Sequence, residues 1–272
     1  MDMVEKGQSF RDMHYADRAF IIPNPYDAGT AKLLATCGFQ ALATTSAGYA
    51  FSAGRPDNNI GRDEMLQHSA MIVQATDLPV SADLENGFHE APEEVARTIA
   101  MAAEVGLVGC SIEDSVNTGP NSGQYDLGFA KERIIAAVEV ARTLPFRFTL
   151  TARAENFLVG NPDIADVVAR LQAYEDAGAD VLYAPGLTSE TDIRTVVESV
   201  GRPVNVVMGL SGVQLGQAEL SVMGVKRIST GSSLARAALG AFLRASNEMR
   251  DHGTFRYADD AVPFGEINTI FS

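Results

Sequence analysis

The chain has 272 residues, of which 46% are hydrophobic, enough to bury one large core and close to the usual length of a single-domain α/β barrel. Its 35 acidic and 21 basic residues give a formal net charge of −14, which argues against nucleic acid or an anionic membrane surface as a partner. An acidic protein that binds a small anion needs local positive charge, so we expect a metal ion or a well-placed arginine.

The two cysteines, Cys37 and Cys110, both lie in apolar stretches, which predicts reduced core thiols rather than a disulfide. The first residues carry charges throughout, and no apolar run approaches the length of a transmembrane helix. We therefore expect a cytoplasmic protein.

From Ala19 onward the chain repeats a short apolar run, a loop rich in Gly, Asp, Asn or Ser, and an amphipathic helix, which is typical of βαβ units and a parallel sheet. The predicted strands are 19–25, 41–47, 79–85, 108–114, 146–155, 180–186, 203–208 and 227–233. The clearest helices are predicted at 28–38, 62–76, 92–106 and 131–143. A further long helix is expected to begin at Asn161 and Pro162 and to end at Gly178.

Eight strand–helix units in this length predict a closed (β/α)8 TIM barrel rather than an open doubly wound sheet. No linker divides the chain, so residues 1–272 are expected to form one domain. Residues from about 240 to 272 are predicted to form a C-terminal helical tail. Because this tail is rich in apolar residues, we expect it to pack on something, and a neighbouring subunit is one option.

Acidic residues follow four consecutive predicted strands: Asp57, the pair Asp83 and Glu85, the pair Glu113 and Asp114, and Glu155. In a (β/α)8 barrel the ends of the strands form the active site, so these carboxylates are expected at one rim. Asp83 and Glu85 are two residues apart and should share a strand face. Clustered carboxylates without matching His or Cys favour Mg²⁺ or Mn²⁺, although each acid could instead be a helix cap.

Arg153 stands at the end of an otherwise apolar, β-branched strand, so its guanidinium should reach the rim carboxylates or an anionic substrate. A purely structural ion pair with a rim glutamate is the alternative. The small residues Thr45, Ser46 and Ala47 could present N–H and hydroxyl groups to a carboxylate. No nucleophile elbow, Walker loop or dinucleotide fingerprint is present in the sequence.

Taken in order, five segments resemble the isocitrate lyase/phosphoenolpyruvate mutase superfamily, and the resemblance covers nearly the whole chain. They are PNPYDAGTAKLLATCGFQALATTSAG at 23–48, GRPD at 54–57, PVSADLENG at 79–87, GCSIED at 109–114 and TARAENFLVG at 151–160. The resemblance implies a Mg²⁺-dependent enzyme acting on a small 2-oxo or 2-hydroxy acid. It also implies homodimers or homotetramers that exchange their C-terminal helices.

The resemblance also assigns site residues. It implies metal binding by Asp83 directly and by Asp57, Glu85 and Glu113 mainly through water. It implies substrate binding by Arg153, by the backbone anion site at Thr45, Ser46 and Ala47, by Asn205 and, from its spacing after Glu113, by Asn121. We expect Arg153, Asp57 and Glu113 to be the catalytic side chains.

The segment after the fourth strand departs from the lyases of this superfamily. It reads SVNTGPNSGQYD, without the Lys-Lys-Cys-Gly-His motif and without the lysine that phosphonomutases place there. Decarboxylation of an oxaloacetate-like acid needs no base to begin, so it is our leading hypothesis for the reaction. Retro-aldol cleavage of a methylisocitrate-like acid is the second hypothesis. The alternatives are cleavage of a P–C bond, as in phosphonomutases or phosphonopyruvate hydrolases, and a protein that binds 2-oxo acids without turning them over.

Overall fold

The computed structural model describes residues 1–116, 123–210, 212 and 214–272. Within these residues, eight parallel strands form one sheet in the order β1-β10-β9-β8-β7-β4-β3-β2. The strands are β1 (Phe20–Ile22), β2 (Leu42–Ala43), β3 (Val80–Asp83), β4 (Gly109–Glu113), β7 (Thr149–Arg153), β8 (Val181–Tyr183), β9 (Val204–Val207) and β10 (Arg227–Ser229). The Ala43 N–H donates to the Pro23 carbonyl at 3.1 Å and so links the two outer strands. The predicted (β/α)8 barrel is confirmed.

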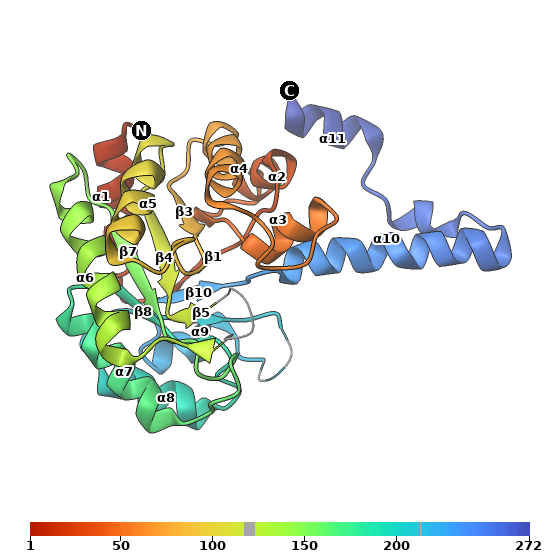
Figure 1. Ribbon diagram of the computed structural model, residues 1–272. Coiled ribbons are helices and arrows are strands. Elements are labelled where there is room, and N and C mark those ends of the chain that lie inside the picture. The colour runs from red at the N-terminus through yellow and green to blue at the C-terminus, as the bar shows by residue number, and fades with distance from the viewer. Residues whose placement is uncertain (117–122, 211, 213) are drawn as a thin grey trace.

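Helices surround this sheet, and five of them overlap the predicted helical ranges (Figure 1). They are α2 (Ala28–Thr36), α4 (Arg62–Gln74), α5 (Pro92–Glu104), α6 (Leu127–Thr143), α7 (Ile164–Asp176), α8 (Glu190–Ser199) and α9 (Gln217–Val222). The predicted start of α7 was wrong by two residues. Asp163, not Asn161, caps the helix, because its carboxylate accepts hydrogen bonds from the N–H groups of Ala165 and Asp166.

Helix α1 (Met3–Met13) was not predicted, although its capping box between Asp2 and Glu5 is a recognisable start signal. Phe10 packs in a cluster with buried residues that precede β2 and β4. Gly7 lies against the chain just before β7, where an added Cβ would stand 2.3 Å from the Arg147 carbonyl oxygen. Helix α1 therefore closes the amino-terminal end of the barrel.

Four further elements follow strand ends. They are α3 (Ser46–Ser52), the hairpin strands β5 (Ser115–Val116) and β6 (Gly123–Gln124), and α10 (Ser233–His252). Helix α10 projects away from the barrel, and α11 (Phe264–Phe271) folds back toward α2 (Figure 1). The C-terminal helical extension is confirmed, and large apolar side chains such as Phe242 and Phe264 are exposed on it.

The expected burial of both cysteines was wrong for one of them. Cys110 is buried in β4, whereas Cys37 at the carboxyl end of α2 is exposed, because this helix end is on the outside of the barrel. In the part of the chain that the structure describes, no helix is both long enough and apolar enough to cross a membrane.

Candidate active site

A cavity of about 460 Å³ opens at the carboxyl-terminal end of the barrel. Its polar lining comes from the strands and from the loops that follow them. The predicted site residues among its lining are Thr45, Ser46, Ala47, Asp57, Asp83, Glu113, Arg153 and Asn205. Glu85 is not part of this lining and borders a neighbouring hollow, and Asn121 lies outside the described residues.

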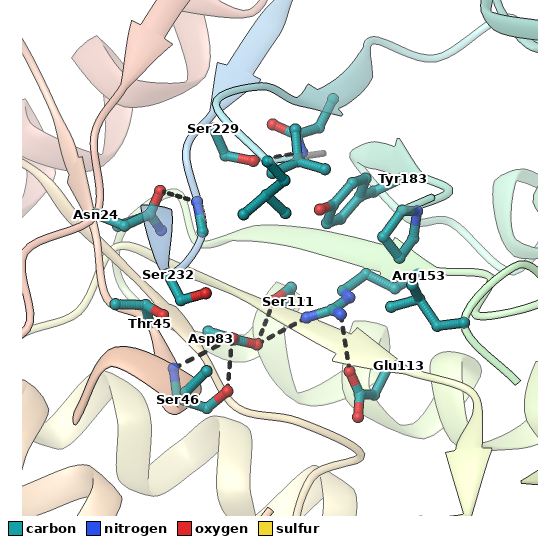
Figure 2. A pocket seen from close by; sticks show the side chains of 18 of the residues that line it. Asn24, Thr45, Ser46, Asp83, Ser111, Glu113, Arg153, Tyr183, Ser229 and Ser232 are labelled. Atoms are coloured by element: carbon teal, nitrogen blue, oxygen red, sulfur yellow. Dashed lines mark hydrogen bonds and ion pairs between the residues drawn. The ribbon is translucent and has the colours of Figure 1, made fainter. Parts of the chain in front are cut away.

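Arg153 is the centre of an ion-pair network in this cavity (Figure 2). Its guanidinium contacts Asp83 at 2.9 Å, Glu113 at 3.0 Å and Glu155 at 2.8 Å. Its carbon Cζ also lies 5.2 Å from the centre of the Tyr183 ring. Burial lowers the pKa of Arg153, but the three carboxylates outweigh it and hold the pKa well above its usual value. The arginine therefore stays charged inside the barrel.

Ser46 links this network to the loop after β2. Its backbone N–H and its hydroxyl both donate to Asp83 Oδ2, at 3.3 and 2.9 Å, and the hydroxyl lies 3.4 Å from Asp57 Oδ1. Thr45 caps α3 by accepting a hydrogen bond from the Gly48 N–H at 3.1 Å, which fixes the start of the helix. Of the groups predicted to bind an anion, the N–H and hydroxyl of Ser46 thus face a carboxylate of the protein itself.

Asp57 and Glu85 are the two acids of the set that lack contact with Arg153. Burial and then the neighbouring Asp83 raise the pKa of Asp57. Burial, followed by the charges of Asp83, Glu113 and Asp57, raises the pKa of Glu85 to about 9. Among the described residues, the buried Glu85 Oε1 has no hydrogen-bond partner. All four predicted metal-binding acids therefore lie in one another's field.

The prediction that Glu85 shares a strand face with Asp83 was wrong. Strand β3 ends at Asp83, and Glu85 has a φ of 48°, in the left-handed region. Its direction is therefore set by a turn after the strand rather than by strand periodicity. The Glu113 N–H donates to the Glu85 carbonyl at 2.9 Å and fixes this turn beside β4.

Asp114 does not belong to the cavity, although it follows Glu113 directly. It accepts hydrogen bonds from Arg170 at 3.1 Å, from Tyr174 and from the Glu155 N–H at 2.9 Å. It therefore holds β4, β7 and α7 together. The Glu155 side chain is turned to the other side and pairs with Arg153, and burial raises its pKa to about 8.

The structure places Glu155 in the cavity wall, as expected from its position after the fifth predicted strand, but sequence reasoning missed other residues of the wall, including Tyr183 and Arg227. Register explains two of them: Arg153 pairs with Tyr183, Tyr183 with Asn205, and Asn205 with Arg227, so these residues form one row around the barrel. Arg227 could have been found by the reasoning applied to Arg153, because it is also a charged residue in a short buried strand.

Comparison with known proteins agrees with this geometry. A family model described as phosphoenolpyruvate phosphomutase matches residues 10–250. A crystal structure from Burkholderia cenocepacia J2315, described as that of a candidate lyase/mutase, is 59% identical with a TM-score of 0.97, covering 99% of this chain and 96% of that chain.

Two relatives with named activities are more distant. The 2-methylisocitrate lyase of Salmonella typhimurium (strain LT2) is 31% identical over 211 residues, or 75% of this chain and 70% of the relative. The crystal structure of phosphonopyruvate hydrolase in complex with oxalate and Mg²⁺ is 25% identical with a TM-score of 0.86, covering 97% of this chain and 94% of that chain. The chain belongs to the phosphoenolpyruvate phosphomutase family and is an enzyme of the isocitrate lyase/phosphoenolpyruvate mutase superfamily.

Proposed function

We propose that this enzyme is a divalent-metal-dependent lyase that breaks a C–C bond in a small 2-oxo or 2-hydroxy acid. The observation that supports this most is the mouth of the barrel, where the buried Arg153 cation stands among Asp83, Glu113 and Glu155. When CO₂ leaves an oxaloacetate-like acid, the bond between C3 and C4 breaks and its electron pair forms the enolate of the 2-oxo group, an anion that a fixed cation in the cavity stabilises. The 2-methylisocitrate lyase among the relatives supports cleavage of a C–C bond.

The metal would be bound by Asp83, Asp57, Glu85 and Glu113. As their side chains are placed, no three His, Cys, Asp or Glu residues in the described part of the chain form a ready-made metal cluster. The donor chemistry nevertheless fits a hard ion such as Mg²⁺ or Mn²⁺, because all four side chains offer only oxygen and Glu85 Oε1 is buried without a partner. Such an ion, when bound, would polarise the 2-oxo carboxylate.

The side chains of the protein have separable tasks in this proposal. Arg153 pairs with the substrate carboxylate, and Ser46 offers its N–H and hydroxyl to the same group in place of Asp83. Decarboxylation of an oxaloacetate-like acid needs no base to begin. Retro-aldol cleavage requires removal of a proton from a 2-hydroxyl, and Asp57, whose pKa is raised by burial and by Asp83, is the carboxylate best suited to accept it.

Cleavage of a P–C bond is the second candidate, because the matching family model is described as a phosphomutase. The sequence SVNTGPNSGQYD after β4 lacks the lysine that phosphonomutases are expected to carry there, which favours C–C cleavage. A protein that binds 2-oxo acids without turning them over is the third candidate.

One substrate panel separates these candidates. The protein is incubated with Mg²⁺ and oxaloacetate, methylisocitrate, dimethylmalate or phosphonopyruvate, and all products are identified. We expect pyruvate together with CO₂ or a carboxylic acid. Release of phosphate, or isomerisation of phosphonopyruvate, would instead establish P–C chemistry. Binding without any product would establish the non-catalytic alternative.

Replacing Asp83 tests the mouth itself. Asp83→Asn keeps the size of the side chain but removes the charge that faces Arg153 and the proposed metal, so we expect turnover to fall at least ~100-fold with Mg²⁺ present. Asp176→Asn on the outer surface of α7 is the matched control and should leave turnover unchanged. Full activity of Asp83→Asn would contradict the metal assignment.

A further inference from the structure

Arg227 is a second buried arginine of the cavity, and it has no counter-ion among the residues that the structure describes. Arg227 is 5% exposed and lines the cavity. It lies in the same row of paired residues as Arg153, three strands away. Three strand spacings of about 4.8 Å put the two Cα atoms within roughly 14 Å of each other. The two side chains can therefore hold opposite ends of one small molecule.

The hydrogen bonds of Arg227 leave most of its guanidinium unused. Its Nε donates to Asn205 Oδ1 at 2.8 Å, and Asn205 Nδ2 in turn donates to Ser229 Oγ at 3.0 Å. Within the described residues, the buried Arg227 Nη1 has no hydrogen-bond partner and no Asp or Glu forms an ion pair with Arg227. Asn205 thus fixes the orientation of the guanidinium without neutralising it.

The neighbours of Arg227 do not supply the missing negative charge. Burial and then the repulsion of Arg153 lower the pKa of Arg227 to about 10, so the guanidinium stays charged at neutral pH. Burial raises the pKa values of the nearby Tyr183 and Cys110, which keeps both groups neutral. His14, which caps the carboxyl end of α1, is neutral as well because burial lowers its pKa to about 3. A buried cation without a partner is unfavourable, and an anionic ligand would relieve it.

We propose that Arg227 is a second anion-binding group of the cavity and binds the far carboxylate of a 2-oxo or 2-hydroxy dicarboxylate. This inference rests on the proposed function, in which the other end of the substrate lies at Arg153 and Asp83. The planar guanidinium matches a carboxylate with two parallel hydrogen bonds, and Asn205 holds it in place for that contact. The enzyme should therefore prefer dicarboxylates to monocarboxylates of the same length.

A pair of ligands tests this in the unmodified enzyme. With Mg²⁺ present, calorimetry compares malate with 2-hydroxybutyrate, which has the same number of carbons but lacks the far carboxylate. We expect malate to bind at least ~10-fold more tightly, the effect of one charge-assisted hydrogen-bonded pair. Equal affinities would overturn the inference.

Variants then locate the effect. Arg227→Gln should weaken malate binding at least ~10-fold while oxalate, whose carboxylates are directly bonded and cannot span the cavity, keeps its affinity within ~2-fold. Arg227→Lys, which retains the charge, should bind malate with an affinity between those of the unmodified enzyme and Arg227→Gln. Arg194→Gln on the outer face of α8 is the control. Equal losses for malate and oxalate would show that Arg227 is only structural. If the unmodified enzyme does not bind oxalate, the proposed function fails instead.

Discussion

The two ends of the barrel differ in the charge of their buried titratable side chains. At the carboxyl-terminal mouth, Arg153 keeps its charge because three carboxylates contact it. At the amino-terminal end, His14, which directly follows α1, is neutral, since burial and, to a lesser extent, the nearby Arg227 lower its pKa to about 3. Burial alone therefore does not determine charge inside this protein. The ordinary pKa of the side chain and the charges around it determine its charge together with burial.

The packing at the two ends differs in the same sense. The His14 ring makes edge contacts with Phe10 and Phe20, with ring centres 4.9 Å apart in both cases. The mouth instead consists of hydrogen-bonded ions whose members depend on one another. Substitutions at the closed end should thus change stability, whereas substitutions at the mouth should change binding and turnover as well.

Removing the cation of the mouth should have the largest effect. Arg153→Gln leaves Asp83, Glu113 and Glu155 together in a buried site, which we expect to lower the free energy of unfolding by about 3–5 kcal/mol. Substrate binding should weaken by at least ~2 kcal/mol because a charge-assisted pair is lost. Urea unfolding and calorimetry measure the two effects.

Magnesium provides an independent readout for the same variant. If the carboxylates bind the metal, Mg²⁺ should raise the melting temperature of Arg153→Gln by more than that of the unmodified enzyme, because it replaces the lost positive charge. An equal shift for both proteins would argue that the acids serve only to hold Arg153. Arg194→Gln again controls for the loss of a surface charge.

The closed end should respond to pH. In the unfolded chain His14 takes up a proton below about pH 6.5, whereas in the folded protein it does so only near pH 3. Between these values the unfolded state binds more protons, so stability falls as the pH decreases from about 6.5 toward 3. Relative to the unmodified enzyme, His14→Phe should gain up to about 4 kcal/mol over this range. A difference in unfolding free energy that does not vary with pH would contradict this assignment.

Much of the fold was predictable because barrels impose a strong local pattern. The alternation of short apolar runs with amphipathic helices fixed the order of the eight strands, and the register confirms them as one parallel sheet. Helix α1 was missed because it lies outside that repeat and its burial depends on contacts with chain segments far away in sequence, as at Gly7 and Arg147. The hairpin of β5 and β6 was missed for a similar reason, since two strands of two residues carry no periodicity.

The site was predictable to the extent that it depends on strand ends. Arg153, Asp83 and Glu113 were expected at the rim, and the structure brings them into contact. The sequence did not indicate that Asp114 would be turned into a structural network or that Glu85 would follow a left-handed turn. Arg227 was overlooked although it is, like Arg153, a charged residue in a short buried strand. Its lack of an ion-pair partner among the described residues becomes visible only in the structure.

A substitution in the C-terminal helices should have the smallest effect on ligand binding and on the stability of the barrel. Helix α10 begins immediately after the mouth residues Gly231 and Ser232 and then leaves the barrel (Figure 1). Its Phe242 is 69% exposed. We propose that a second copy of the chain covers this apolar face. Phe242→Ser should then shift the oligomer toward monomer in light scattering, because the face loses a large apolar side chain. Oxalate affinity should change by less than ~2-fold, since every side chain assigned to the mouth comes from the same barrel. If Phe242→Ser lowers both assembly and oxalate affinity, the neighbouring copy contributes to the mouth. The difference between the two ends is then a property of the oligomer rather than of the single chain.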